Sequence, residues 1–217
     1  MPKAVIRPDF KYVLFEEVYS RLESPKAQRR AFAITHAAIQ CLARRDYDEV
    51  TLEYVAREAG VTRQALKKYF VDADDMKLVA LKYIRLLFQK LALDATEKQR
   101  TPDKMLSAYV LACFHWEREF HVHAVAWYSF LQRCSRQPKL RAINSAAVRV
   151  GTDRITTLLE EGRALGVFHC TDCAQTARII QLLITGGVLS SMSEDRENMA
   201  GVPETIERAC LQLAQGR

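Results

Sequence analysis

A short basic cluster is the first part of this sequence whose residue types could do recognisable chemistry. Four polar residues fall within six positions, at spacings that share one face of a helix: Arg63, Gln64, Lys67 and Lys68. Their side chains donate hydrogen bonds and three are positively charged, so they could contact phosphate oxygens and the edges of bases. The cluster predicts a nucleic-acid contact, with the solvated basic face of an ordinary helical hairpin as the plainer alternative.

Two short amphipathic segments joined by a glycine would position this cluster. Thr51 can cap a first helix, and Gly60 follows where a helix often ends in a left-handed conformation. Thr62 can cap the next helix, whose Leu66 and Phe70 would face inward and leave the basic residues outside. Two short helices joined by such a turn, the second one basic, predict a helix-turn-helix that enters the DNA major groove.

The whole chain is long enough for one or two domains and is composed like a globular protein. Of its 217 residues, 49% are hydrophobic and 27% are charged, a balance not typical of disordered chains. Helical periodicity continues along almost all of the sequence without a convincing alternating strand, which predicts an all-α fold. No apolar run reaches the roughly 20 residues that span a bilayer, so we expect no membrane partner and a cytoplasmic protein.

The positive charge of the chain is concentrated in its N-terminal part. Residues 1–92 hold 17 Lys and Arg against 12 Asp and Glu, whereas residues 93–217 hold 15 against 14. The net charge of +6 therefore divides into +5 and +1. A basic N-terminal region beside a near-neutral remainder favours a polyanion-binding head, although solvated basic surface would give the same balance.

The residues around the basic cluster resemble the TetR family of bacterial transcriptional regulators, from about Ala31 to Leu81. The similar features are a first helix, an aromatic residue after a turn, a threonine that opens the second helix, the pattern A-x-x-A-G-V-[ST], and a recognition helix ending in Tyr-Phe. Asp46 stands where the family commonly has glycine, Lys67 where it usually has tyrosine, and Ala73 where it usually has a phosphate-contacting lysine. The amides that begin the next helix would remain available for phosphate.

This resemblance implies a domain organisation. The expected parts are an N-terminal extension over 1–24, a three-helix helix-turn-helix DNA-binding domain over 25–74, and a larger helical ligand-binding and dimerisation domain over 75–217. The extension would be a leading helix over about 9–22 or a basic arm. Start and break signals predict the later helices at about 74–92, 102–119, 121–134, 139–164, 171–192 and 203–215.

The resemblance also implies a function. The protein would be a sequence-specific transcriptional regulator that binds double-stranded DNA as a homodimer, with no enzymatic activity and no cofactor. It would act as a repressor that an unknown small-molecule effector releases from a palindromic operator. A DNA-binding organiser or partner-controlled regulator without such an effector is the alternative. An enzyme is least favoured, because no activated nucleophile, phosphate loop or acid pair is arranged credibly.

Roles within the helix-turn-helix follow from the same resemblance. The residues expected to contact the DNA backbone are Thr51, Thr62, Lys67, Lys68 and Tyr69. The residues expected to contact base edges are Arg63, Gln64 and Ala65. Arginine pairs well with guanine and glutamine with adenine, and alanine can touch the thymine methyl group.

A second group of candidates concentrates aromatic residues and histidines in FHWEREFHVHAVAWYSF, residues 114–130. An organic ligand pocket would use aromatic side chains, and ordinary helix packing is the alternative. The expected pocket residues are Tyr109, Phe114, Trp127 and Phe130. No metal site is expected, because the spacing of His115, His121 and His123 does not bring them together on one helix.

The sequence HCTDC contains Cys170 and Cys173 in a C-x-x-C spacing. The second pair of ligands needed for a structural zinc site is missing, and no alternation of strands and helices surrounds the motif. A thiol-based redox or metal sensor is therefore a minor alternative. The plainer interpretation is a loop followed by a helix that Thr171 or Asp172 caps.

Two apolar segments near the C-terminus, TARIIQLLITGGVLSSM and ETIERACLQLAQ, could form a dimer interface. Gly186 and Gly187 lie inside the first of them and would cost helix stability. Close approach of a helix would offset that cost, either from a second subunit, as the resemblance implies, or from the same chain.

Overall fold

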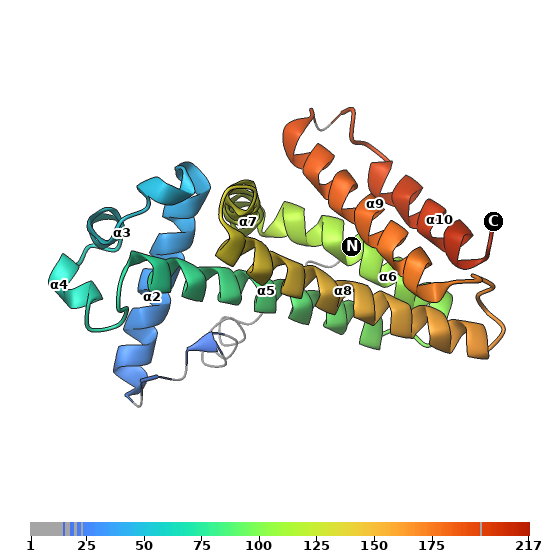
Figure 1. The fold of residues 1–217 in the computed structure, drawn as a ribbon, viewed down its shortest axis with the longest axis horizontal. Coiled ribbons are helices and arrows are strands. Elements are labelled where there is room, and N and C mark those ends of the chain that lie inside the picture. Colours follow the sequence, from blue (N-terminus) through green and yellow to red (C-terminus); the bar gives the residue numbers. More distant parts are fainter. Residues whose placement is uncertain (1–14, 16–17, 20, 23, 196) are drawn as a thin grey trace. The chain divides into compact units, whose positions relative to one another are not determined.

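The computed structural model describes residues 15, 18–19, 21–22, 24–195 and 197–217. This described part consists of helices joined by turns and contains no β-strand (Figure 1), which confirms the expected all-α fold. Most of the leading helix expected over 9–22 lies outside the described residues. Among the described helices, none is long and apolar enough to cross a membrane.

The first helices include those of the expected helix-turn-helix. They are α2 (Pro25–Arg44), the 3-10 helix η1 (Tyr47–Glu49), α3 (Leu52–Glu58), α4 (Arg63–Leu66) and α5 (Ala73–Glu97) (Figure 1). Pro25 opens α2, where a missing amide costs no helical hydrogen bond. α5 ends at Glu97 instead of near residue 92, because no glycine or proline interrupts the chain before Pro102.

The later helices lie close to their expected positions. They are α6 (Pro102–Glu119), α7 (His121–Cys134), α8 (Pro138–Ala164), α9 (Cys173–Ser193) and α10 (Val202–Ala214) (Figure 1). Pro102 and Pro138 occupy the first turns of α6 and α8, as proline start signals predict. The Asp172 carboxylate caps α9 by accepting a hydrogen bond from the Gln175 amide at 2.9 Å, which confirms one of the two caps expected there.

Contacts within the chain divide it into two compact units, which are described separately. Unit 1 comprises residues 1–87 and 122–136, and unit 2 comprises residues 88–121 and 137–217. This division differs from the expected parts 1–24, 25–74 and 75–217, because the first half of α5 and most of α7 pack with α2. Tyr83 of α5 and His123 of α7 both contact His36 of α2. The expected parts divide the chain by function and stay a prediction.

An aromatic cluster forms the centre of unit 1. The ring centroid of the fully buried Tyr83 lies 5.9 Å from that of Phe32 and 5.4 Å from that of His36. The His123 ring lies 5.8 Å from the His36 ring, and the Phe15 ring lies 6.1 Å from the Tyr83 ring. Burial raises the pKa of the Tyr83 hydroxyl. The cluster joins α2, α5 and α7, and α3 packs against α2 of this group.

Unit 2 is built from α6, α8, α9 and α10, which pack against one another (Figure 1). A small residue permits the close packing of α9. A Cβ atom added to Gly187 would overlap Ile206 Cδ1 of α10 and would lie 2.8 Å from Phe114 Cζ of α6. A Cβ atom added to Gly186 would meet no heavy atom within 4 Å. Gly187 is therefore explained by packing within the chain, whereas Gly186 faces open space.

Candidate nucleic-acid interface

Threonine hydroxyls begin both short helices of the expected helix-turn-helix. Thr51 Oγ1 accepts a hydrogen bond from the Tyr54 amide at 3.2 Å, and Thr62 Oγ1 accepts one from the Ala65 amide at 3.1 Å. These bonds satisfy amides that have no partner inside their helices, which is why threonine is favoured at both positions. The two caps confirm the helix starts expected from the sequence, while the DNA contacts assigned to both threonines stay predictions.

A glycine turn sets the angle between α3 and α4. Gly60 has a φ of 63°, in the left-handed region, and the following Val61 amide donates to the Ala56 carbonyl at 2.9 Å. A Cβ atom added to Gly60 would meet nothing within 4 Å, so glycine is required here for backbone conformation and not for close packing. The turn is a helix C-terminus of the type that left-handed glycine makes possible.

The recognition helix is shorter than expected. α4 ends at Leu66 instead of at Tyr69-Phe70, and tighter turns follow, in which the Lys68 amide donates to the Ala65 carbonyl and the Tyr69 amide to the Leu66 carbonyl. Such three-residue hydrogen bonds close the last turn of many helices. Leu66 and Phe70 are nevertheless buried as expected, so the apolar face of this segment still points inward.

The basic cluster lies on the outside of this segment. Arg63, Gln64, Lys67 and Lys68 are all exposed, whereas Ala65 and Tyr69 are half-buried. In the described part of the chain, Lys67 and Lys68 make no ion pair with an acidic residue. The helix-turn-helix therefore presents hydrogen-bond donors and positive charge to the solvent, which is the chemistry that phosphate and base edges require.

Arg63 forms an ion pair with Glu53, a contact that the sequence did not predict. Its Nη1 atom lies 2.6 Å from Glu53 Oε1, in the first turn of α3, and both side chains are more than half exposed. The carboxylate partly neutralises the guanidinium and directs it across the gap between the two helices. Its partner is ten residues away on another helix, so only the angle set at Gly60 brings the two side chains together.

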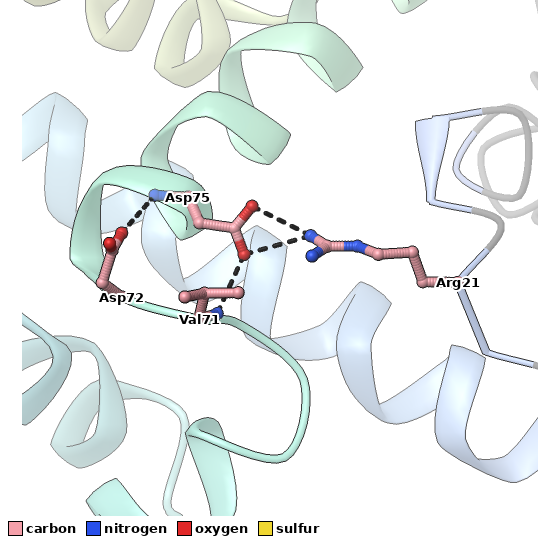
Figure 2. Close-up of polar contacts among 4 residues, drawn as sticks. All are labelled: Arg21, Val71, Asp72 and Asp75. Carbon is pink, nitrogen blue, oxygen red and sulfur yellow. Dashed lines mark hydrogen bonds and ion pairs between the residues drawn. The ribbon is translucent and has the colours of Figure 1, made fainter.

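The start of α5 is not the open phosphate site that was expected. Asp72 Oδ1 accepts a hydrogen bond from the Asp75 amide at 2.8 Å, and Asp75 Oδ2 accepts one from the Val71 amide at 2.9 Å (Figure 2). The expectation of available amides was therefore wrong for the Asp75 amide in the first turn of α5, because the Asp72 carboxylate already caps it. Ala73, in place of the family lysine, adds no donor.

A buried lysine fixes the connection between α2 and α3. Lys77 Nζ lies 4.3 Å from the Tyr47 ring centroid, within cation–π range, and 3.0 Å from Asp74 Oδ1. Tyr47, the aromatic residue after the turn, is buried, and burial raises the pKa of its hydroxyl. The sequence alone predicts neither contact, since Lys77 and Tyr47 are 30 residues apart.

The aromatic ligand candidates fall into two pairs, one in each unit. Tyr109 and Phe114 are buried on α6 in unit 2, where burial raises the pKa of Tyr109. Trp127 and Phe130 lie on α7 in unit 1, with ring centroids 5.0 Å apart. Their role in ligand binding stays a prediction.

The histidine His121 and the cysteine pair of HCTDC make separate local contacts. His121 Nδ1 lies 3.0 Å from Glu117 Oε1, and the described residues contain no group of three side chains placed to hold a metal ion. Cys170 Sγ lies 3.1 Å from Cys173 Sγ, and both thiols are buried. Burial and the neighbouring Cys170 raise the pKa of Cys173 to about 11, which disfavours the reactive thiolate at neutral pH.

Two family models match this chain, one in its N-terminal part and one in its C-terminal part. Residues 34–76 match the model of bacterial regulatory proteins of the TetR family, a range that contains α3 and α4, the second half of α2 and the first turn of α5. Residues 102–215, more than half of the chain, match the model of the C-terminal part of BetI-type transcriptional repressors. No curated protein matches the chain.

Several solved structures share this fold at low sequence identity. A protein from Rhodococcus sp. assigned to the TetR family of transcriptional regulators is 18% identical, with a TM-score of 0.75 over 86% of this chain and 99% of that one. A transcriptional regulator from Pseudomonas aeruginosa PAO1 is 20% identical, with a TM-score of 0.75 over 91% and 92%. One from Saccharomonospora viridis, in complex with choline, is 20% identical, with a TM-score of 0.72 over 87% and 95%.

The matched segments and the geometry of the helix-turn-helix agree. The N-terminal match contains the two threonine caps, the Gly60 turn and the exposed basic cluster. The C-terminal match covers α6 to α10. The chain belongs to the TetR family of bacterial regulatory proteins and is a DNA-binding transcriptional regulator.

Proposed function

We propose that this regulator is a homodimeric repressor that binds a palindromic operator and is released from it by a small organic molecule. The observation that carries the proposal is the exposed basic cluster on and after α4. Its side chains face the solvent, whereas Leu66 and Phe70 of the same segment are buried. A dimer with twofold symmetry presents two such clusters, and a palindromic site offers one half-site to each.

The dimer is supported by apolar surface on α9 and α10. Leu182 and Leu189 of α9 are 63% and 49% exposed, which is unusual for leucine on a water-facing helix. A groove of about 530 Å³ runs between the two helices beside them, lined by Leu182, Gly186, Met199 and Ile206 among others. A second copy of the chain would cover this apolar face, and Gly186 would let the partner helix approach closely.

The repressor role and the ligand are supported by the relatives. The C-terminal family model describes repressors, and the Saccharomonospora viridis protein holds choline. The residues that we propose for ligand contact are Tyr109 and Phe114 within unit 2, and Trp127 and Phe130 within unit 1. Ligand binding would favour one conformation of the dimer over another and so lower its affinity for the operator.

Titration of an operator duplex in the presence of candidate ligands tests the proposal. The duplex carries the site enriched from random DNA, and the first probe is choline, followed by a panel of small organic cations and acids. We expect at least one ligand to raise the thermal unfolding temperature and to release the duplex. Equal operator affinity across the panel would favour the partner-controlled regulator, and transcription that rises on binding would contradict repression.

The phosphate contact assigned to Lys68 has a distinct expected signature. Lys68→Ala should weaken binding to every duplex about equally, because a phosphate contact carries no base information. The dependence of log affinity on log salt concentration should become shallower by about one unit per subunit, or about two units for the dimer, since each subunit releases one counterion fewer. Titrations of operator and random duplexes at several salt concentrations measure both effects. An unchanged slope would remove Lys68 from the interface.

A thiol sensor is the second candidate, because Cys170 and Cys173 lie close enough to form a disulfide after a small movement. The raised pKa of Cys173 argues against fast oxidation. We therefore expect mild peroxide treatment at pH 7.5 to leave the operator affinity unchanged. A loss of binding on oxidation that Cys173→Ser abolishes would instead establish the sensor.

A further inference from the structure

A segment that precedes the region matched by the N-terminal family model contacts the turn after the recognition helix α4. The N-terminal family model begins at residue 34, so Phe15, Tyr19 and Arg21 lie outside it. Phe15 and Tyr19 are nevertheless 0% and 2% exposed, and the Tyr19 amide donates to the Phe15 carbonyl at 2.9 Å, as in a helical turn. Side chains buried this deeply belong to the folded core of unit 1.

The aromatic contacts of this segment lead to the end of the recognition segment. The Tyr19 ring centroid lies 5.5 Å from that of Phe70, the residue that ends the turns after α4. The Phe15 ring lies 5.6 Å from Tyr19 and 5.3 Å from Phe32, so it links Tyr19 to α2. Aromatic pairs at these distances attract each other beyond the area that they bury. Tyr19 therefore holds Phe70 against the core.

Arg21 fastens the same turn through a carboxylate. Its Nη2 atom donates to both oxygens of Asp75, at 2.9 and 3.0 Å, and Asp75 Oδ2 also accepts from the Val71 amide (Figure 2). The guanidinium lies 4.8 Å from the Tyr19 ring centroid, in cation–π range. One carboxylate thus joins Arg21 to the backbone directly after Phe70.

The other two carboxylates of this turn have different partners. Asp72 caps the Asp75 amide (Figure 2), and Asp74 pairs with the buried Lys77. Asp75 is the acidic residue of the turn that receives Arg21, and its side chain is only 25% exposed. The arrangement therefore brings together one cation, one carboxylate and one backbone amide.

We propose that Tyr19 and Arg21 form a clasp that positions the recognition helix for base contact, an inference that rests on the proposed reading of DNA by α4. α4 has only four residues, so its direction depends on what holds its two ends. The Gly60 turn holds the first end, and the clasp holds the second through Phe70 and Val71. Arg21 is a positioning residue that acts through Asp75.

Arg21→Ala in the full-length protein tests the clasp. Affinity for the duplex enriched from random DNA should fall about three- to fivefold, the range that a half-exposed ion pair can supply. Affinity for a random-sequence duplex should change less than twofold, and the salt slope should match that of the wild type. A slope shallower by about one unit per subunit, with both duplexes weakened, would make Arg21 a phosphate contact and overturn the clasp.

Three further variants separate positioning from the loss of charge. Asp75→Asn should weaken operator binding about as much as Arg21→Ala, and the double variant should be no weaker than either, because both remove one interaction. Tighter operator binding by Asp75→Asn would show that Arg21, once released, contacts DNA, and would contradict the clasp. Arg149→Ala, which removes an exposed arginine from α8 in unit 2, is the matched control and should leave operator affinity unchanged.

Hydrogen exchange of the free protein tests the clasp without DNA. Arg21→Ala should speed exchange in the segment over residues 67–75, which includes the Val71 amide, whereas Arg149→Ala should not. Tyr19→Phe keeps the ring and should exchange like the wild type, while Tyr19→Ala should exchange faster. Unchanged exchange in both Arg21→Ala and Tyr19→Ala would overturn the clasp. Faster exchange together with no DNA site enriched would leave the clasp standing and remove only the proposed function.

Discussion

Arg63→Ala is expected to weaken binding to the enriched operator by about 1–3 kcal/mol per half-site, the usual cost of losing one good contact to a base. Arg63 is exposed at the start of α4, and its partner in the free protein is Glu53, another exposed side chain that DNA can displace. We also expect relaxed preference at one base pair of each half-site, because alanine leaves that base edge without a donor. Titrations against all four base pairs at each position measure the relaxation.

The comparison with Lys68→Ala makes the Arg63 result specific. Both variants lose one positive charge from the same exposed segment, so a purely electrostatic effect would weaken all duplexes alike in both. Base-dependent weakening should appear in Arg63→Ala alone. If Arg63→Ala kept the wild-type preference at every position, Arg63 would contact the backbone or no DNA at all.

Gly162→Ala is expected to destabilise the protein by about 1–3 kcal/mol, the typical cost of overpacking a core. An added Cβ atom would overlap ring carbons of Phe168, which is fully buried and so cannot move aside into solvent. Chemical denaturation followed by circular dichroism measures the change in the free energy of unfolding.

A double-mutant cycle controls this prediction. Phe168→Leu removes the ring that the new methyl group would meet, so the double variant Gly162→Ala/Phe168→Leu should be more stable than the sum of the single changes implies. Strict additivity would contradict the clash, and stabilisation by Gly162→Ala alone would show that helix propensity outweighs it.

The helices could be predicted from the sequence because their signals are local. Pro25, Pro102 and Pro138 mark helix starts, and Thr51 and Thr62 cap the two short helices, each through residues at most four positions away. The length of α4 was predicted less well. Leu66 and Phe70 face inward both in a continuous α-helix and in the tighter turns that follow Leu66. The spacing of these apolar residues therefore does not predict where the helix ends.

The contacts that adjust the interface could not be predicted, because they join residues far apart in the sequence. Arg21 and Asp75 are separated by 54 positions, and Lys77 reaches Tyr47 across 30. Which amides the Asp72 and Asp75 carboxylates cap depends on side-chain geometry, which the sequence does not give. Sequence patterns therefore predicted which face of the α4 segment is basic. The contacts that position this segment form only between residues that folding brings together.

Selection of bound sites from random duplex DNA tests the central claim most directly. The account predicts enrichment of a palindrome whose two half-sites are related by the twofold symmetry of the dimer, and loss of preference at one position per half-site in Arg63→Ala. Recovery of no enriched sequence, or of a single asymmetric site bound by a monomer, would contradict it.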